Sequence, residues 1–206
     1  VSDITTTTTI VTAAGYIPCF LDKTSISGVE NQVVQIKKND NTTAQRAFFN
    51  AGVIGTAWTE ISDGDFTGII HRGKIEHMDG YAFVLGSDNK IYNSDINSLA
   101  NWTATGFISK LIQRDHAVGL ARLSNQIIAF GDETAEVFYN AGNPSGSPLS
   151  PIKQLQLKVG LSPMLGTQTA QYYCVLSNRM YFIGREVGGT LAVGIYMYDG
   201  SSMHKI

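Results

Sequence analysis

The sequence predicts an all-β protein that folds as a β-propeller, or as part of one, built from four-stranded antiparallel blades. An apolar run ending in glycine occurs three times, as YAFVLG at 81–86, IIAFG at 127–131 and MYFIG at 180–184. A polar turn and a second strand-like run follow each one, and the final glycines lie 45 and 53 residues apart. Repeats of several strands with a period of about 40–50 residues are typical of propeller blades. The 21 glycines, nine tyrosines and nine phenylalanines also suit short strands joined by turns.

The composition limits the classes of function. A chain of 206 residues with 43% hydrophobic and 16% charged residues is large enough for a well-buried globular domain. The net charge of −2, with acids and bases interspersed, provides no overall field that would attract DNA or an anionic membrane. Two distant cysteines, Cys19 and Cys174, exclude a dense disulfide framework, and we expect both to be reduced, packed thiols.

No apolar stretch approaches the roughly 20 residues that a membrane-spanning helix needs. Residues 1–10 also lack the basic region of a secretory signal. Without such a stretch, we expect no membrane insertion. The chain begins with Val1 rather than Met, which indicates processing or truncation.

The first third of the chain has the fewest strand signals. The threonine-rich residues 1–12 suit an edge strand or a frayed end, and Pro18 confines the run at 15–22 to an edge position or a strand start. Residues 33–37 predict a strand that ends at an Asn-Asp-Asn turn. Residues 44–54 fit either a short helix or a strand. Residues 58–61 predict a short strand, followed by a turn and Phe66 as an aromatic anchor.

The remaining residues predict three hairpins. The first covers 78–95, and after it residues 96–107 lack a strand period, which predicts a loop that places Trp102 against the blade. A strand at 115–123 leads into the second hairpin at 126–142. Residues 153–160 alternate between apolar and polar side chains and predict a half-buried strand, and residues 172–176 predict another strand. The third hairpin covers 178–200, with Gly188-Gly189 as its turn.

Several segments, taken in order, resemble a known family. They are TEISDGDFTG at 59–68, MDGYAFVLGSDNKIYNSD at 78–95, the Asn101-Trp102 pair, RDHAVGLARLSNQIIAFGDETAEVFYNAGNPSG at 114–146 and NRMYFIGREVGGTLAVGIYMYDGSSMHKI at 178–206. Together they resemble the tail hub proteins of short-tailed bacteriophages, also called packaged-DNA stabilisation proteins or tail accessory factors. The matching features are a strand that ends at Phe130-Gly131, a hairpin arm at 136–142 and a strand that ends at Gly160.

This resemblance implies a structural protein of the virion tail. Its members would form a hexameric ring beneath the portal and its adaptor, which lines the conduit for packaged DNA and meets the distal tail proteins below. DNA would pass as a transient, non-specific partner. Chains of the family are typically about twice as long, so residues 1–206 represent about four blades of an internal part or of a shortened relative. The resemblance covers 59–206, and residues 1–58 match less well.

No pattern in the sequence predicts catalysis, a cofactor or a metal site. The four histidines, His71, His77, His116 and His204, lack the spacing of metal ligands. The carboxylate pairs Asp63/Asp65 and Asp132/Glu133 lie in turns, where aspartate usually accepts hydrogen bonds from backbone N–H groups. The chain has no nucleophile elbow and no phosphate-binding glycine loop.

One loop is a candidate docking site for a neighbouring subunit or another tail protein. Its prolines limit the freedom of the unfolded chain and present an extended backbone, although a plain surface connection explains it equally well. The candidate residues are Asn143, Pro144, Ser145, Gly146, Ser147, Pro148, Leu149, Ser150 and Pro151.

The sequence therefore predicts a non-enzymatic tail hub or nozzle that retains packaged DNA and provides the conduit for its ejection. Two alternatives stay open. One is a propeller that binds or cleaves glycans on a host surface, and the other is a β-sandwich adhesion domain.

Overall fold

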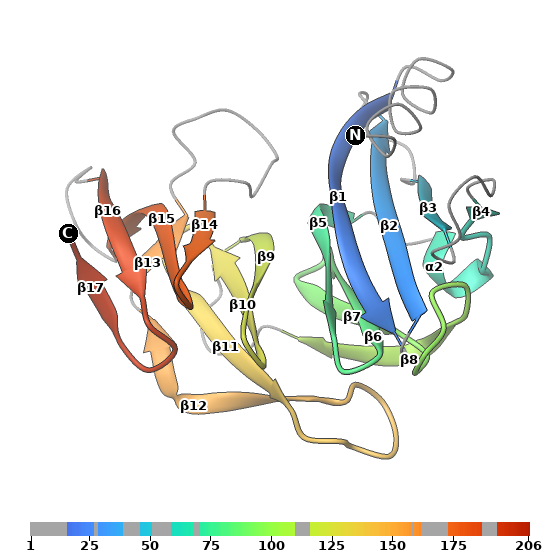
Figure 1. Ribbon diagram of the computed structural model, residues 1–206. Helices are drawn as coiled ribbons and strands as arrows, with labels where there is room; N and C mark the ends of the chain where they lie inside the picture. The colour runs from blue at the N-terminus through green and yellow to red at the C-terminus, as the bar shows by residue number, and fades with distance from the viewer. Residues whose placement is uncertain are drawn as a thin grey trace.

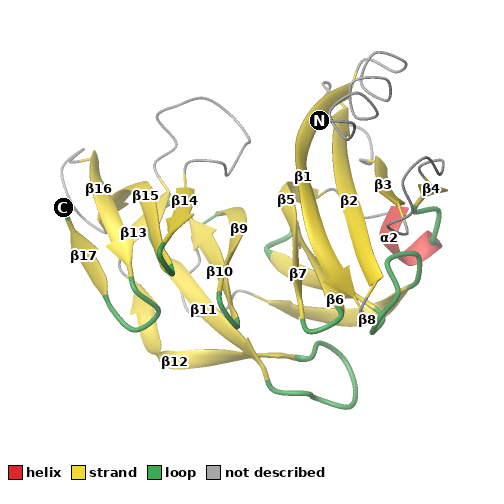
Figure 2. Ribbon diagram, in the orientation of Figure 1, coloured by secondary structure: helices red, strands yellow, loops and turns green. Residues whose placement is uncertain are grey.

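The computed structural model describes residues 16–26, 29–38, 46–50, 59–67, 71–109, 116–157, 159–161, 173–186 and 193–206. Within these ranges the chain is almost entirely β-strand (Figures 1 and 2). The strands form four separate antiparallel sheets, and each sheet is built from consecutive strands of the chain. In the described residues no helix is long and apolar enough to span a membrane.

The first sheet and the helix after it come from the N-terminal third. Its strands, in spatial order, are β1 (Tyr16–Ile26), β2 (Val29–Lys38), β3 (Arg46–Asn50) and β4 (Thr59–Glu60). Pro18 lies in β1, at the edge of the sheet as predicted. The sequence left helix or strand open for residues 44–54, and this range contains the strand β3. The expected turn after β4 contains a single helical turn, α2 (Gly64–Thr67).

The second and third sheets contain the first two predicted hairpins. The strands of the second sheet are β5 (His71–Met78), β6 (Tyr81–Gly86), β7 (Lys90–Ser94) and β8 (Trp102–Ser109). The strands of the third sheet are β9 (Ala117–Leu123), β10 (Gln126–Gly131), β11 (Ala135–Asn140) and β12 (Leu149–Leu157). Asp79 and Gly80 connect β5 to β6 with φ angles of 52° and 84°, as a tight two-residue hairpin turn requires.

The fourth sheet has five strands. They are β13 (Val159–Leu161), β14 (Tyr173–Leu176), β15 (Arg179–Glu186), β16 (Val193–Tyr198) and β17 (Met203–Lys205), with both β13 and β14 paired to β15. The strand predicted at 153–160 is thus two strands, because β12 ends in the third sheet and β13 begins in the fourth.

Three hydrophobic cores join successive elements of the chain. The first core packs Ile61 and Phe66, beside α2, against one face of the second sheet. The second core joins the opposite face of that sheet to the third sheet, and the third core joins the third sheet to the fourth. The second, third and fourth sheets therefore stack face to face in chain order, as propeller blades do, rather than extending one continuous sheet.

The alternation of side chains along β6 explains this stacking. Ala82 and Val84 belong to the first core, whereas Phe83 and Leu85 belong to the second. Successive residues of a strand point to opposite faces, so a continuous apolar run suits a strand covered on both sides. Burial of each such side chain contributes about 1.5–3 kcal/mol to folding. The β-propeller prediction is confirmed.

Strands near the start of each sheet meet close to the middle of the molecule. β5 contacts both β1 and β9, and Figure 1 shows β5 and β9 between the two outer groups of strands. The Tyr173 hydroxyl on β14 donates a hydrogen bond to the Glu76 carboxylate on β5. This bond connects the fourth sheet to the second across the centre.

Some expectations from the sequence were wrong. Residues 96–107 are not all loop, because β8 begins at Trp102. The Trp102 side chain is nevertheless buried, and its indole N–H donates to the Leu99 carbonyl at 3.1 Å. Cys174 is free but exposed rather than packed. The threonine run at 5–9, the side chain of Cys19 and the Gly188-Gly189 turn lie outside the described residues.

Candidate docking site

The candidate docking loop connects β11 to β12 at the end of the third sheet (Figure 2). Residues 141–146 are exposed, whereas Ser147, Pro148 and Leu149 are buried. The last three candidate residues, Leu149, Ser150 and Pro151, belong to β12, where they pair with Asn140, Tyr139 and Phe138. The exposed part is therefore shorter than the predicted range. β12 is the edge strand of the third sheet, where Pro151, which has no N–H to donate, is tolerated beside a register shift.

Hydrogen bonds inside the loop hold its shape. The Asn143 side-chain amide donates to the carbonyls of Ser147 and Leu149, at 3.0 and 3.2 Å. The backbone N–H of Ala141 donates to the Pro148 carbonyl at 2.8 Å, and that of Gly142 donates to the Asn140 side chain at 2.9 Å. A loop braced in this way loses little conformational entropy when a partner binds it.

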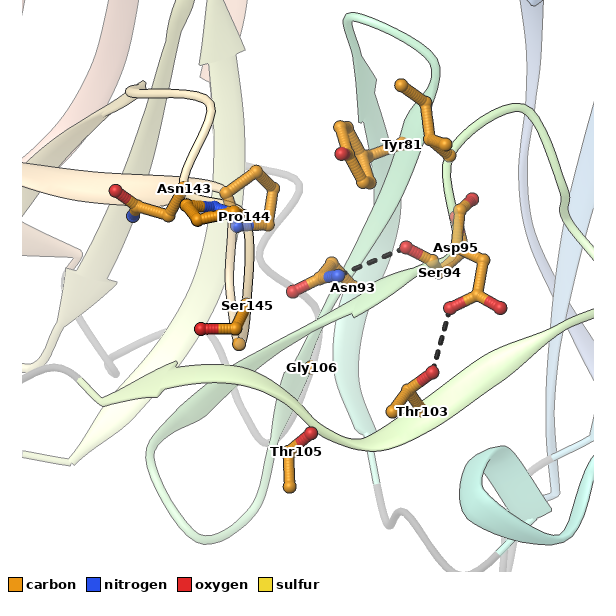
Figure 3. Close-up of a pocket in the computed structure, with 13 residues that line it drawn as sticks. Tyr81, Asn93, Ser94, Asp95, Thr103, Thr105, Gly106, Asn143, Pro144 and Ser145 are labelled. Carbon is orange, nitrogen blue, oxygen red and sulfur yellow. Dashed lines mark hydrogen bonds between the residues drawn. The ribbon is translucent and has the colours of Figure 1, made fainter.

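The loop also lies against the second sheet. At its base, the Asn140 side chain donates to the Asp79 carboxylate at 3.0 Å, which ties the end of β11 to the β5–β6 turn. At its tip, a Cβ placed on Gly146 would lie 3.7 Å from the Thr105 carbonyl oxygen on β8. Between these two contacts the loop and the second sheet enclose a cavity of about 470 Å³ (Figure 3). Such a volume falls within the usual range for ligand pockets.

A β-bulge shapes the floor of this cavity. Tyr92 pairs with Phe107 and Ser94 pairs with Trp102, so that Asn93 alone on β7 faces the four residues 103–106 of β8. Gly106 fits here because it has no side chain. A Cβ at this position would lie 3.0 Å from the Thr103 carbonyl oxygen and 3.2 Å from Asn93 Nδ2. Bulges of this kind commonly redirect side chains next to functional sites.

Asn93 is the most unusual polar residue of the cavity. Its side chain is only 5% exposed, and its Nδ2 donates to the Ser94 carbonyl at 3.0 Å. The Oδ1 atom is buried and accepts no hydrogen bond within the described part of the chain. Figure 3 shows this oxygen pointing toward the loop that carries Asn143 and Ser145. Nothing in the sequence predicts a buried acceptor at this position, because Asn93 looks like an ordinary hairpin residue.

Asp95 supplies negative charge at the same site. Its Oδ1 accepts a hydrogen bond from the Thr103 hydroxyl at 2.9 Å, and both residues are exposed. Among the described residues, no lysine, arginine or histidine lines the cavity. A cation or a neutral hydrogen-bond donor is therefore favoured here over an anion.

The carboxylate pairs singled out in the sequence have structural roles. Asp63 accepts hydrogen bonds from the backbone N–H groups of Asp65 and Trp102, at 2.8 and 3.3 Å. Asp65 accepts one from Ala104 N–H at 3.0 Å, and these bonds fasten α2 to β8. In the second pair, Glu133 lies 3.3 Å from Arg185 in an ion pair between the third and fourth sheets.

The histidines with described side chains lie apart from one another. His77 is buried in β5, His116 is exposed before β9, and His204 lies 3.5 Å from Asp199 near the C-terminus. The part of the chain that the structure describes contains no cluster of three potential metal ligands.

Comparison with known proteins gives one family match. The model of the phage stabilisation family, described as bacteriophage P22 Gp10, β-propeller, matches residues 12–206. No curated protein matches the chain.

The similar solved structures include two of low sequence identity. One is BamB from Moraxella catarrhalis, with 12% identity and a TM-score of 0.47 over 91% of this chain and 52% of that one. The other is PorZ, a surface component of the type IX secretion system of Porphyromonas gingivalis, with 14% identity and a TM-score of 0.30 over 94% of this chain and 28% of that one. The chain thus spans about half the length of BamB.

Proposed function

Because this chain belongs to the phage stabilisation family, the β-propeller family of bacteriophage P22 Gp10, we propose that it forms a hub ring below the portal and adaptor of the tail. Membership makes it a structural protein of the phage virion. The finer role is to retain the packaged DNA and to provide the conduit for its ejection. The ring is a homo-oligomer with six copies, and it meets the distal tail proteins on its other side.

One observation supports this proposal above the others. The second and third sheets each contribute side chains to two hydrophobic cores, one on either face, so that hydrophobic packing continues from α2 to the fourth sheet. Closely packed interiors resist compression and transmit strain. A subunit built in this way can withstand the load of packaged DNA without a catalytic step, and its function depends on shape and on its interfaces.

The charge of the chain suits a conduit. The net charge is −2, and the lysines and arginines are scattered along the sequence rather than concentrated, as they would be in a protein that neutralises phosphates and binds DNA tightly. Weak, non-specific contact lets DNA pass, whereas tight binding would slow its ejection. We therefore expect measurable DNA affinity only at low salt.

The loop at 141–148 supports the subunit interface of the ring. It is braced from within, its tip is exposed, and it projects beyond the end of the third sheet (Figure 1). A preformed loop of this kind is well suited to dock on a neighbouring chain.

The test is retention of DNA by particles that lack the protein. Phage assembled without it should package DNA and then lose it, so that the genome becomes sensitive to added nuclease. Supplying the purified protein to the defective particles should restore protection. Particles that keep their DNA without the protein, or protein that instead binds host glycans on an array, would contradict the proposed function.

A further inference from the structure

We propose that the cavity between the second sheet and the 141–148 loop binds a guanidinium group, presented by an arginine on an extended segment of another protein chain. The inference rests on the proposed function in one respect, which is that the other chain belongs to the assembled tail. The chemistry of the cavity is a property of this chain alone.

The buried acceptor at Asn93 is the first reason. The Asn93 Nδ2 atom donates a hydrogen bond to the Ser94 carbonyl. Only the amide nitrogen can donate, so this bond sets the orientation of the amide group and places Oδ1 on the cavity side. A buried acceptor without a hydrogen bond costs about 1–3 kcal/mol. A donor that enters the cavity removes this cost.

The charge of the cavity is the second reason. Asp95 is its one charged lining residue, and in the described chain segments no cationic side chain pairs with this carboxylate. Hydrogen bonds from a cation to a carboxylate are about twice as strong as neutral ones. The same charge disfavours phosphate, so the cavity does not suit the DNA backbone.

The geometry favours arginine over lysine. Asn93 lies near the end of β7 and Asp95 directly follows that strand, so the two acceptors are two residues apart, and Figure 3 shows the Tyr81 ring on the same side of the sheet. A guanidinium group is planar, carries five N–H donors in a fixed fork and stacks on aromatic rings. An ammonium group is a compact point charge that offers only three donors.

The arginine comes from a peptide segment, because one wall of the cavity is the braced 141–148 loop. This wall contains Pro144 and Pro148 and is held by Asn143, so it is already shaped to receive an extended chain. Backbone N–H groups on either side of the arginine would then lie near the threonine-rich edge of β8 at residues 103–105.

The experiment uses two blocked tripeptides, acetyl-Gly-Arg-Gly-amide and acetyl-Gly-citrulline-Gly-amide, which differ in charge but hardly in shape. Titration into the 206-residue chain is followed by NMR. The arginine peptide should shift the Asn93 side-chain amide signals, and the citrulline peptide should bind about tenfold more weakly or not at all. Affinity for the arginine peptide should fall as salt rises, because Asp95 is exposed.

Variants of the chain locate the site. Asp95→Asn should weaken binding of the arginine peptide about tenfold. Asp88→Asn removes the same charge from the turn before β7, at the other end of that strand, and should leave the affinity unchanged. Ser145→Phe should fill the cavity and abolish binding. Thermal unfolding of each variant, followed by circular dichroism, confirms that it is folded.

Several results would overturn the inference. They are the absence of saturable binding of the arginine peptide, equal binding of the citrulline peptide, and loss of binding in Asp88→Asn to the same degree as in Asp95→Asn. Spermidine that binds as tightly as the peptide would assign the cavity to small polyamines, and a neutral oligosaccharide that displaces the peptide would assign it to glycans. None of these results bears on DNA retention, which tests the proposed function separately.

Discussion

The Tyr198 hydroxyl donates a hydrogen bond to the side-chain amide oxygen of Gln126 at 2.9 Å. Tyr198 ends β16 in the fourth sheet, and Gln126 begins β10 in the third. The Gln126 amide nitrogen donates at the same time to the Gly200 carbonyl at 3.0 Å. One glutamine therefore holds both the end of β16 and the turn after it against the preceding sheet.

Replacing Tyr198 with phenylalanine tests this connection. The Tyr198→Phe variant keeps the buried ring but removes the hydroxyl, so we expect the free energy of unfolding to fall by about 1 kcal/mol. Urea denaturation measures the change. Tyr181→Phe is the matched control, because Tyr181 is only half-buried and lies on the opposite face of the same sheet. Equal losses in the two variants would contradict the role of the Gln126 contact.

The same tyrosine predicts sensitivity to alkali. Burial, with a further contribution from the negative charge of Asp199, raises the pKa of Tyr198 to about 12. The folded state thus favours the protonated phenol. Its stabilising contribution is complete below the unfolded pKa near 10 and is lost as pH rises through about 12. The unfolding free energy should decline more steeply over this interval in the parent than in Tyr198→Phe, and parallel curves would refute the assignment.

Asp199 predicts the opposite behaviour in acid. The N–H groups of Ser202 and Ser201 donate to its Oδ1 at 2.8 and 2.9 Å, and these bonds, with the Ser201 hydroxyl, hold the pKa of the carboxyl well below its usual range. This contribution to stability is present above the unfolded pKa near 4 and is lost as pH falls below it. Asp199→Asn should lose less stability than the parent between pH 4 and pH 2 in urea denaturation. Identical acid profiles would show that the turn does not depend on this charge.

A pair of aromatic rings tests the packing between blades. Phe130 in the third sheet and Phe182 in the fourth lie with ring centroids 4.9 Å apart and an interplanar angle of 60°. In a double-mutant cycle with Phe130→Leu and Phe182→Leu, we expect a coupling energy of about 0.5–1.5 kcal/mol. Phe66 and Phe182, which belong to different cores, provide the control and should give additive effects. Additivity in the first pair would show that the two sheets do not pack face to face.

Local sequence patterns predicted the blades because the relevant signals lie within single hairpins. The continuous apolar runs around Phe83 and Phe130 indicate strands covered on both faces, and the glycines that end them mark the turns. Trp102 was correctly expected to pack against the blade. The strand that begins there was missed because the bulge at residues 103–106 interrupts its alternation.

The cavity could not be predicted in the same way. It forms where Asn93 and Gly146, more than 50 residues apart in the chain, come together from different sheets. The docking loop itself was found from its prolines and glycine, but three of its predicted residues belong to β12. A proline such as Pro151 usually marks a loop, and it joins a strand here because β12 lies at the edge of its sheet.

Cryo-electron microscopy of the intact phage locates this chain within the tail. We expect a closed ring of copies of the chain, coaxial with the portal and around the DNA channel, with the 141–148 loop at the contact between neighbouring copies. Single copies at the periphery of the tail, or a location away from the channel, would contradict it.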